Sequence, residues 1–150
     1  MSSQYIIFRL DDERFAVEIE QVLEIIHTQT VFKVPNSPPY IEGLINLRGK
    51  VYPLFNLRKK FNLASPMNDK SEKSKVLIVN AGTSYIGMEV DTVDGILQIG
   101  DDSIEDTPST VSVNTKSYVK AVAKVNEKLI LLLNLEAIIE SSPELTVSVK

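Results

Sequence analysis

The sequence predicts a mostly-β protein built from two small barrels and a few short helices. Short runs of β-branched and aromatic residues recur along the chain, each bounded by turn residues. Similar hairpin patterns lie on either side of a polar stretch at 64–75. Helical spacing is confined to two short segments. Such a set of elements is typical of small all-β architectures rather than of layered α/β folds.

Composition narrows the class of protein. A chain of 150 residues suffices for one domain, or for two small halves that share a core. It has no cysteine, which excludes disulfides and thiolate metal sites and fits a reducing compartment. The net charge of −4 argues against non-specific nucleic-acid binding and against attachment to anionic lipid. The longest apolar run, 129–133, is too short to span a bilayer, so we expect a soluble, cytoplasmic protein without direct membrane insertion.

The N-terminal part predicts a hairpin and then a helix. Residues 5–10 and 15–17 form extended runs on either side of a polar turn at 11–14. From residue 19 the spacing changes to i, i+3, i+4 and i+7, which predicts a short helix. The apolar positions of that helix are Ile19, Val22, Leu23 and Ile26. Residues 31–34 are expected to form a strand.

The segment 34–57 is rich in proline and glycine, and it predicts a rigid bend followed by a hairpin. Residues 44–47 indicate a strand, 48–50 a tight turn and 51–55 the returning strand. Pro53 cannot donate a ladder hydrogen bond. The returning strand is therefore expected to lie at a sheet edge or to carry a bulge at that residue.

The second half predicts further hairpins. The expected strands are 76–79, 85–90, 121–125 and 129–133, with an irregular segment at 100–117 and a helix capped by Asn134. We expect a single domain over 1–150. Its parts are a first barrel mainly at 15–63, a charged loop at 64–75, a second barrel mainly at 76–134 and a C-terminal helix at 135–141. The N-terminal strand 5–10 is compatible with either barrel.

Catalytic patterns are weak. His27 is the only histidine and has no serine or carboxylate at a motif spacing, and no glycine-rich phosphate loop occurs. The carboxylate groups Asp91 with Asp94 and Asp101 with Asp102 are best explained as solvated turns, with a metal-dependent hydrolase as the rival hypothesis. We therefore predict no enzyme activity, no cofactor and no metal site.

The proline and glycine frame, with N-L-R-G inside it, resembles the CheW-like domain family. The most specific positions are Val34, Pro35, 39–41, Gly43, 46–49, Val51 and 53–57. Supporting positions are Phe8, Leu10, 22–25, 87–91, Val93 and 131–135. Among these, the residues expected to shape the frame are Pro35, Gly43, Asn46, Gly49 and Pro53. The likeness runs from about residue 5 to residue 139, nearly the whole chain.

The resemblance implies two five-stranded SH3-like barrels packed about a shared apolar seam, without catalysis. It implies a chemotaxis adaptor that joins the cytoplasmic tips of methyl-accepting chemoreceptors to the histidine kinase CheA, through the kinase's own CheW-like regulatory domain. Such a protein works at membrane-associated receptor arrays through its partners. A scaffold of a twitching or other array is the alternative.

The resemblance also implies binding sites. Arg48 matches the family arginine of N-L-R-G and Glu24 the acidic residue of V-x-E-I, and we expect them to form an ion pair. The residues expected to bind the receptor, in a groove between the barrels, are Val22, Glu24, Ile25, Arg48, Val90 and Val93. The residues expected to bind the kinase are Val31, Phe32, Tyr40 and Ile41. For each apolar residue, a place in the core is the alternative.

Overall fold

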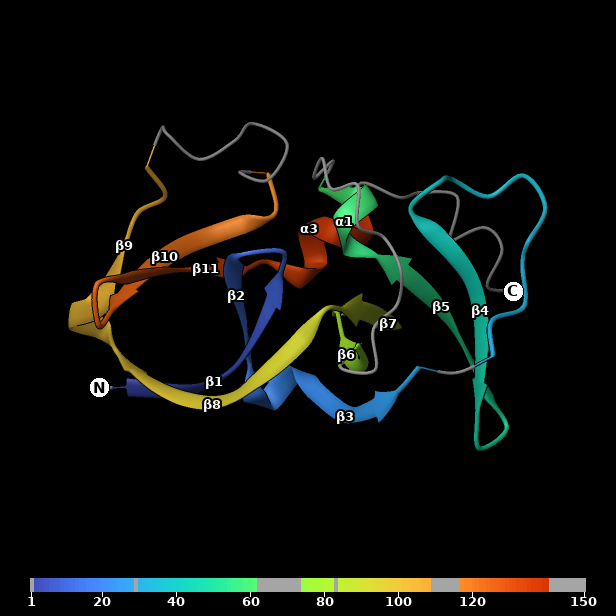
Figure 1. Cartoon of the computed structure of the whole chain (residues 1–150), viewed down its shortest axis with the longest axis horizontal. Helices are drawn as coiled ribbons and strands as arrows, with labels where there is room; N and C mark the ends of the chain where they lie inside the picture. Colours follow the sequence, from blue (N-terminus) through green and yellow to red (C-terminus); the bar gives the residue numbers. More distant parts are fainter. Residues whose placement is uncertain (1, 29, 62–73, 83, 109–116, 141–150) are drawn as a thin grey trace.

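The computed structural model of the chain consists of two sheets with short helices between them (Figure 1). The structure describes residues 2–28, 30–61, 74–82, 84–108 and 117–140. In sheet order, the six-stranded sheet contains β8 (Thr92–Gly100), β1 (Ser2–Leu10), β2 (Glu13–Glu18), β11 (Lys128–Leu133), β10 (Val119–Val125) and β9 (Ile104–Glu105). The five-stranded sheet contains β3 (Val22–His27), β6 (Lys75–Asn80), β7 (Tyr85–Val90), β5 (Lys50–Asn56) and β4 (Ile41–Leu47). The predicted mostly-β class is confirmed.

The helices are short. They are the 3-10 turns η1 (Ile19–Gln21) and η2 (Asp101–Ser103) and the α-helices α1 (Leu57–Lys60) and α3 (Leu135–Glu140). In Figure 1, α1 and α3 lie between the two sheets. Asn134 Oδ1 accepts a hydrogen bond from Ala137 N at 3.2 Å, which confirms the predicted helix cap.

Each sheet curls upon itself without a continuous closing ladder among the described residues. In the six-stranded sheet, β8 lies at one end of the strand order and continues through η2 into β9. β9 pairs with β10 at the other end. In the five-stranded sheet, a single bridge joins the segment after β3 to β4. Phe32 N donates to Leu44 O at 2.8 Å, and Leu44 N donates to Phe32 O at 2.8 Å. The sheets are therefore SH3-like, with six and five strands rather than two closed barrels of five.

The sequence suggested that the charged loop divides the two barrels. The division between the sheets falls elsewhere. The chain crosses from the six-stranded to the five-stranded sheet at η1, and it returns between β7 and β8. β6 and β7 therefore belong with β3, β4 and β5, whereas β1 and β2 join the later strands. Hairpins of similar pattern do not reveal which distant strand each will pair with, because pairing is a tertiary property. The loop at 64–73 itself lies outside the described residues.

Three apolar clusters form the core. One lies in the seam between the sheets, and the others fill the interior of each curled sheet. On β1, Phe8 and Leu10 face the seam while Tyr5 and Ile7 face the interior, because successive side chains point to opposite faces. The uninterrupted apolar runs of the sequence are thus strands buried on both faces.

The predicted helix over Ile19 to Ile26 is wrong. Only Ile19–Gln21 is helical, and β3 follows at once. Val22, Ile25 and Ile26 are β-branched, and pairing with β6 satisfies their backbone groups. A register shift between Val22 and Glu24 sends the apolar side chains to both faces of the strand, which imitates helical spacing in the sequence.

Two smaller predictions also change. Residues 31–34 form only the isolated bridge at Phe32, and Leu129 is exposed rather than buried at the start of β11.

The strand that contains Pro53, β5, is a central strand and not an edge strand. Its pairing with β7 begins at Leu54, one residue after Pro53. The proline therefore lies outside that ladder, as its missing N–H requires. The segment 100–117, expected to be irregular, contains η2 and β9, and its part at 109–116 lies outside the described residues, as does the C-terminal tail from 141.

Candidate functional site: two exposed apolar surfaces

The β4–β5 turn presents Arg48 in a fixed backbone. Leu47 pairs with Lys50, and the two residues between them, Arg48 and Gly49, have φ values of 52° and 86°. Such a pair of positive φ values is typical of a two-residue hairpin turn of type I′. Asn46 Oδ1 accepts a hydrogen bond from Gly49 N at 3.1 Å, which braces the turn. The predicted tight turn is confirmed.

The expected ion pair between Arg48 and Glu24 is present. Arg48 Nη1 donates to Glu24 Oε2 at 2.9 Å and Nη2 donates to Oε1, so the contact is bidentate. β3 and β4 are the two edges of the five-stranded sheet, so the pair joins β3 to the turn that follows β4. Glu24 lies opposite Ile78, a residue of that sheet's interior. Its side chain therefore faces the interior side of β3, not the seam.

Phe32 is an exposed aromatic side chain on a fixed backbone. Its side chain is 58% exposed, although its N–H and C=O both bond to Leu44. Gly43 permits this close approach. It has a φ of 147°, and a Cβ on it would overlap Phe32 O and lie 2.8 Å from Val31 Cγ1.

The other expected kinase-binding residues are more enclosed. Val31 packs against the interior of the five-stranded sheet, and Ile41 is a buried residue of the seam. Tyr40 is half-buried and stacks on Phe55 with ring centroids 5.8 Å apart. Lys60 Nζ lies 3.8 Å from the centroid of the Tyr40 ring. Pro35 lies in the turn that leads to this region. Phe32 is thus the exposed member of the predicted kinase set.

A second apolar surface follows the seam along β3 and β8, each an edge strand of its sheet. Val22 and Val93 are half-buried against the seam cluster. Ile25 lies opposite Leu77 and Ile96 opposite Ile6, and both opposing residues belong to the seam. The side chains of Ile25 and Ile96 therefore face the seam side of their strands, where they are 41% and 58% exposed. We call Val22, Ile25, Val93 and Ile96 the seam strip.

Two corrections follow for the expected receptor groove. Val90 is 1% exposed and belongs to the seam core, so it cannot line a surface. Ile96 was missed by sequence reasoning. The signal was present, because Ile96 and Leu97 are adjacent in a strand and must point to opposite faces. Leu97 packs inward, which leaves Ile96 outside.

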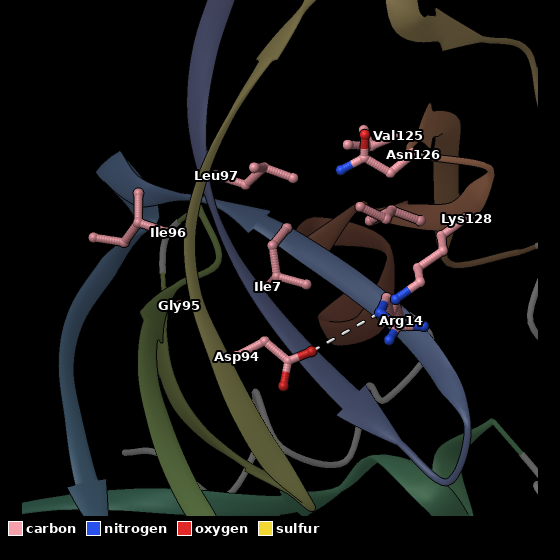
Figure 2. Close-up of a pocket in the computed structure, with 10 residues that line it drawn as sticks. Ile7, Arg14, Asp94, Gly95, Ile96, Leu97, Val125, Asn126 and Lys128 are labelled. Atoms are coloured by element: carbon pink, nitrogen blue, oxygen red, sulfur yellow. Dashed lines mark ion pairs between the residues drawn. The ribbon is translucent and has the colours of Figure 1, made fainter.

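A pocket of about 220 Å³ opens between β8 and the β10–β11 hairpin (Figure 2). Its lining includes Ile7, Leu97, Arg14 and Asp94, and also Ile96, although the Ile96 side chain points to the other side of β8. Asp94 forms ion pairs with two arginines. Arg9 Nε donates to Asp94 Oδ1 at 3.2 Å, and Arg14 Nε lies 3.9 Å from Oδ2. None of the predicted partner-binding residues lines this pocket.

Asp91, which was grouped with Asp94 in the metal-site hypothesis, is held by Arg58. Arg58 Nη2 donates to Asp91 Oδ2 at 2.6 Å and Nε donates to Oδ1 at 3.1 Å. Burial acts to raise the pKa of Asp91, but the hydrogen bonds from Arg58 and from Asp11 N, with the charge of Arg58, outweigh it and lower that pKa. The hydrogen bond to Asp91 raises the pKa of Arg58. Within the described ranges, no three His, Cys, Asp or Glu residues converge as metal ligands.

Comparison with known proteins agrees with this architecture. A family model described as the CheW-like domain matches residues 4–142. The chain belongs to the CheW-like family. The chemotaxis protein CheW of Helicobacter pylori is 32% identical over 137 residues, which cover 91% of this chain and 81% of that protein. CheW of Bacillus subtilis is 28% identical over 135 residues, covering 90% and 85%.

A solved structure of the same family is similar in fold. The crystal structure of the scaffolding protein TtCheW from Thermoanaerobacter tengcongensis matches with a TM-score of 0.85 and 32% identity, over 93% of this chain and 94% of that chain. In the part of the chain that the structure describes, no helix is long and apolar enough to cross a membrane.

Proposed function

We propose that this CheW-like protein is a non-enzymatic adaptor of a chemotaxis array, which couples methyl-accepting chemoreceptors to the histidine kinase CheA. The observation that carries the proposal is the CheW-like match over residues 4–142, together with the fold shared with a scaffolding protein. The names of the relatives favour chemotaxis over a twitching or other array. The protein then works at membrane-associated arrays, where its partners hold it.

The seam strip is the proposed receptor surface. A receptor tip is a helical hairpin, and an amphipathic helix presents apolar side chains at i, i+3, i+4 and i+7 to an apolar groove. Val22 and Val93 are anchored against the seam core, and Ile25 and Ile96 offer exposed aliphatic surface. Association would remove these side chains from water, which is the main source of affinity at such a surface.

Phe32 and the Glu24–Arg48 pair form the proposed kinase surface. Each belongs to a contact between one edge of the five-stranded sheet and the other, at Leu44 for Phe32 and at the β4–β5 turn for Glu24, and the side chain of Glu24 points away from the seam. We therefore assign Glu24 and Arg48 to the kinase rather than to the rim of the receptor groove. Aromatic residues and arginine are the residue types enriched at interface hot spots. Val31, Tyr40 and Ile41 pack into the core on either side of the bend and are proposed to hold its backbone rather than to touch the kinase.

Two charge substitutions separate the proposed surfaces. Ile96→Glu is expected to abolish co-sedimentation with receptor cytoplasmic fragments and to leave binding to the CheA regulatory domain intact. Phe32→Glu is expected to do the reverse. Both side chains are more than half exposed, so both variants should melt like the wild type. Leu129→Glu is the matched control, since Leu129 is 43% exposed on β11 and belongs to neither surface.

Two results would contradict the proposal. If the wild type does not bring receptor fragments and kinase into one complex, the adaptor function is refuted. If each charged variant loses both partners without a change in melting, the assignment to two separate surfaces is refuted, although the adaptor function stands.

A further inference from the structure

The seam strip depends on the point where the chain returns to the six-stranded sheet. β7 ends at Val90 and β8 begins at Thr92, so Asp91 is the crossover residue. Asp91 N donates to Arg9 O at 3.1 Å, and Asp91 Oδ2 accepts a hydrogen bond from Asp11 N at 2.7 Å. Both contacts fix the start of β8 against the β1–β2 hairpin.

The first residues of β8 need such an anchor. Thr92 pairs with Arg9 and Val93 with Phe8, but the register shifts before Gly95, which pairs with Ile7. A bulge interrupts the ladder at this point. Gly95 has a φ of 131°, and nothing lies within 4 Å of the position of a Cβ there. No side chain therefore packs over the Cβ position of Gly95, which lies between Val93 and Ile96 of the seam strip.

Arg58 connects this crossover to the other sheet. It lies in α1, which directly follows β5 of the five-stranded sheet. Its guanidinium donates two hydrogen bonds to Asp91, and its Nη2 also lies 2.6 Å from Asp11 Oδ1. Its side chain is 20% exposed, so these contacts are partly shielded from water. One planar cation thus binds both aspartates that hold the start of β8.

We propose that Arg58 is a positioning residue for partner binding: through Asp91 it fixes the start of β8, which holds Val93 and Ile96 on the seam side of that strand, and so preforms the seam strip. The inference rests on the proposed receptor surface. Arg58 itself is not placed in either partner surface. A preformed surface binds more tightly, because the partner does not have to order it.

The chemistry of arginine matters here. Its fork binds Asp91 with two parallel hydrogen bonds while Nη2 also reaches Asp11. A lysine ammonium is a point charge on a flexible stem and cannot reproduce the bidentate contact. Arg58→Lys therefore keeps the charge and removes the geometry. Arg14→Lys is the matched control, since Arg14 also faces β8 but lies 3.9 Å from Asp94.

The test compares hydrogen exchange with partner affinity in the full chain. In Arg58→Lys we expect backbone amides at 92–96 to exchange about tenfold faster or more, whereas amides of β3 and β6 stay unchanged. Affinity for the receptor cytoplasmic fragment should fall about fivefold or more, and affinity for the CheA regulatory domain should stay within about twofold. Asp91→Asn should give the same pattern. The double variant should be no worse than either single variant, because both act through one contact.

Several results would overturn the inference. Unchanged exchange at 92–96 would show that Arg58 does not position β8. Faster exchange throughout the chain with equal loss of both partners would show a general structural role. The same effect in Arg14→Lys would show that any arginine facing β8 suffices. If the wild type binds no receptor fragment, the proposed receptor function fails, while the exchange at 92–96 still decides the positioning role.

Discussion

Replacing Gly43 by alanine is the sharpest test of how the backbone presents Phe32. A Cβ at Gly43 would overlap the Phe32 carbonyl oxygen, and the φ of 147° is one that alanine rarely adopts. Backbone strain of this kind costs about 1–3 kcal/mol. Relief of the overlap moves Phe32 away from β4 and breaks its two hydrogen bonds with Leu44, at about 0.5–1.5 kcal/mol each. We expect Gly43→Ala to lower the free energy of unfolding by about 2–6 kcal/mol.

Gly49→Ala is the matched control for strain alone. Gly49 has a φ of 86°, but nothing lies within 4 Å of its Cβ position, so we expect a loss of only about 1–2 kcal/mol. Urea unfolding of the two variants measures the difference, and titration with the CheA regulatory domain measures the consequence for Phe32. Gly43→Ala should weaken kinase binding, because Phe32 loses its fixed backbone. Equal destabilisation by the two substitutions, or full kinase affinity in Gly43→Ala, would refute the reasoning.

Three further predictions concern charge and core. The pKa of Asp91 is lowered in the folded state, so its contribution to stability is present above its unfolded pKa of about 4 and is lost as the pH falls through the folded pKa. In Asp91→Asn the free energy of unfolding should therefore depend less on pH in the acid range. Urea titrations at several pH values measure this dependence. Arg48→Ala should change stability by only about 0–1 kcal/mol, because its pair with Glu24 is a surface contact, so any large loss of kinase binding in pull-downs is direct. Val90→Asp should prevent folding, seen by circular dichroism, since Val90 is buried in the seam; a folded variant would contradict its place in the core.

The hairpins were predictable from the sequence because their signals are local. Alternating apolar residues and the N-L-R-G turn identify β5 within one residue of its observed bounds and the end of β4 at Leu47, although β4 begins three residues before the predicted start at Leu44. The pair of Arg48 with Glu24 was expected from family resemblance alone. Spacing could not have found it, because the residues come from opposite edges of one sheet.

The helix predicted from residue 19 failed for a physical reason. A helix and a bulged strand can both produce apolar residues at positions such as Val22 and Ile26. Only the pairing with β6 shows that this segment is a strand. The same nonlocal pairing placed β6 and β7 with β3 rather than with the later strands. It also buried Val90 and Ile41, which composition alone could not distinguish from exposed interface residues.

The sequence by itself determined the mostly-β class, the hairpins, the positive-φ turn at Arg48 and the family, because each depends on neighbouring residues or on a short motif. Only the tertiary structure decided which strands share a sheet, that Glu24 faces away from the seam while Ile25 faces it, and that Ile96 joins the seam strip. A strand turns alternate side chains to opposite sides, so the face a residue occupies follows from register and bulges. These are fixed by partners distant in the chain.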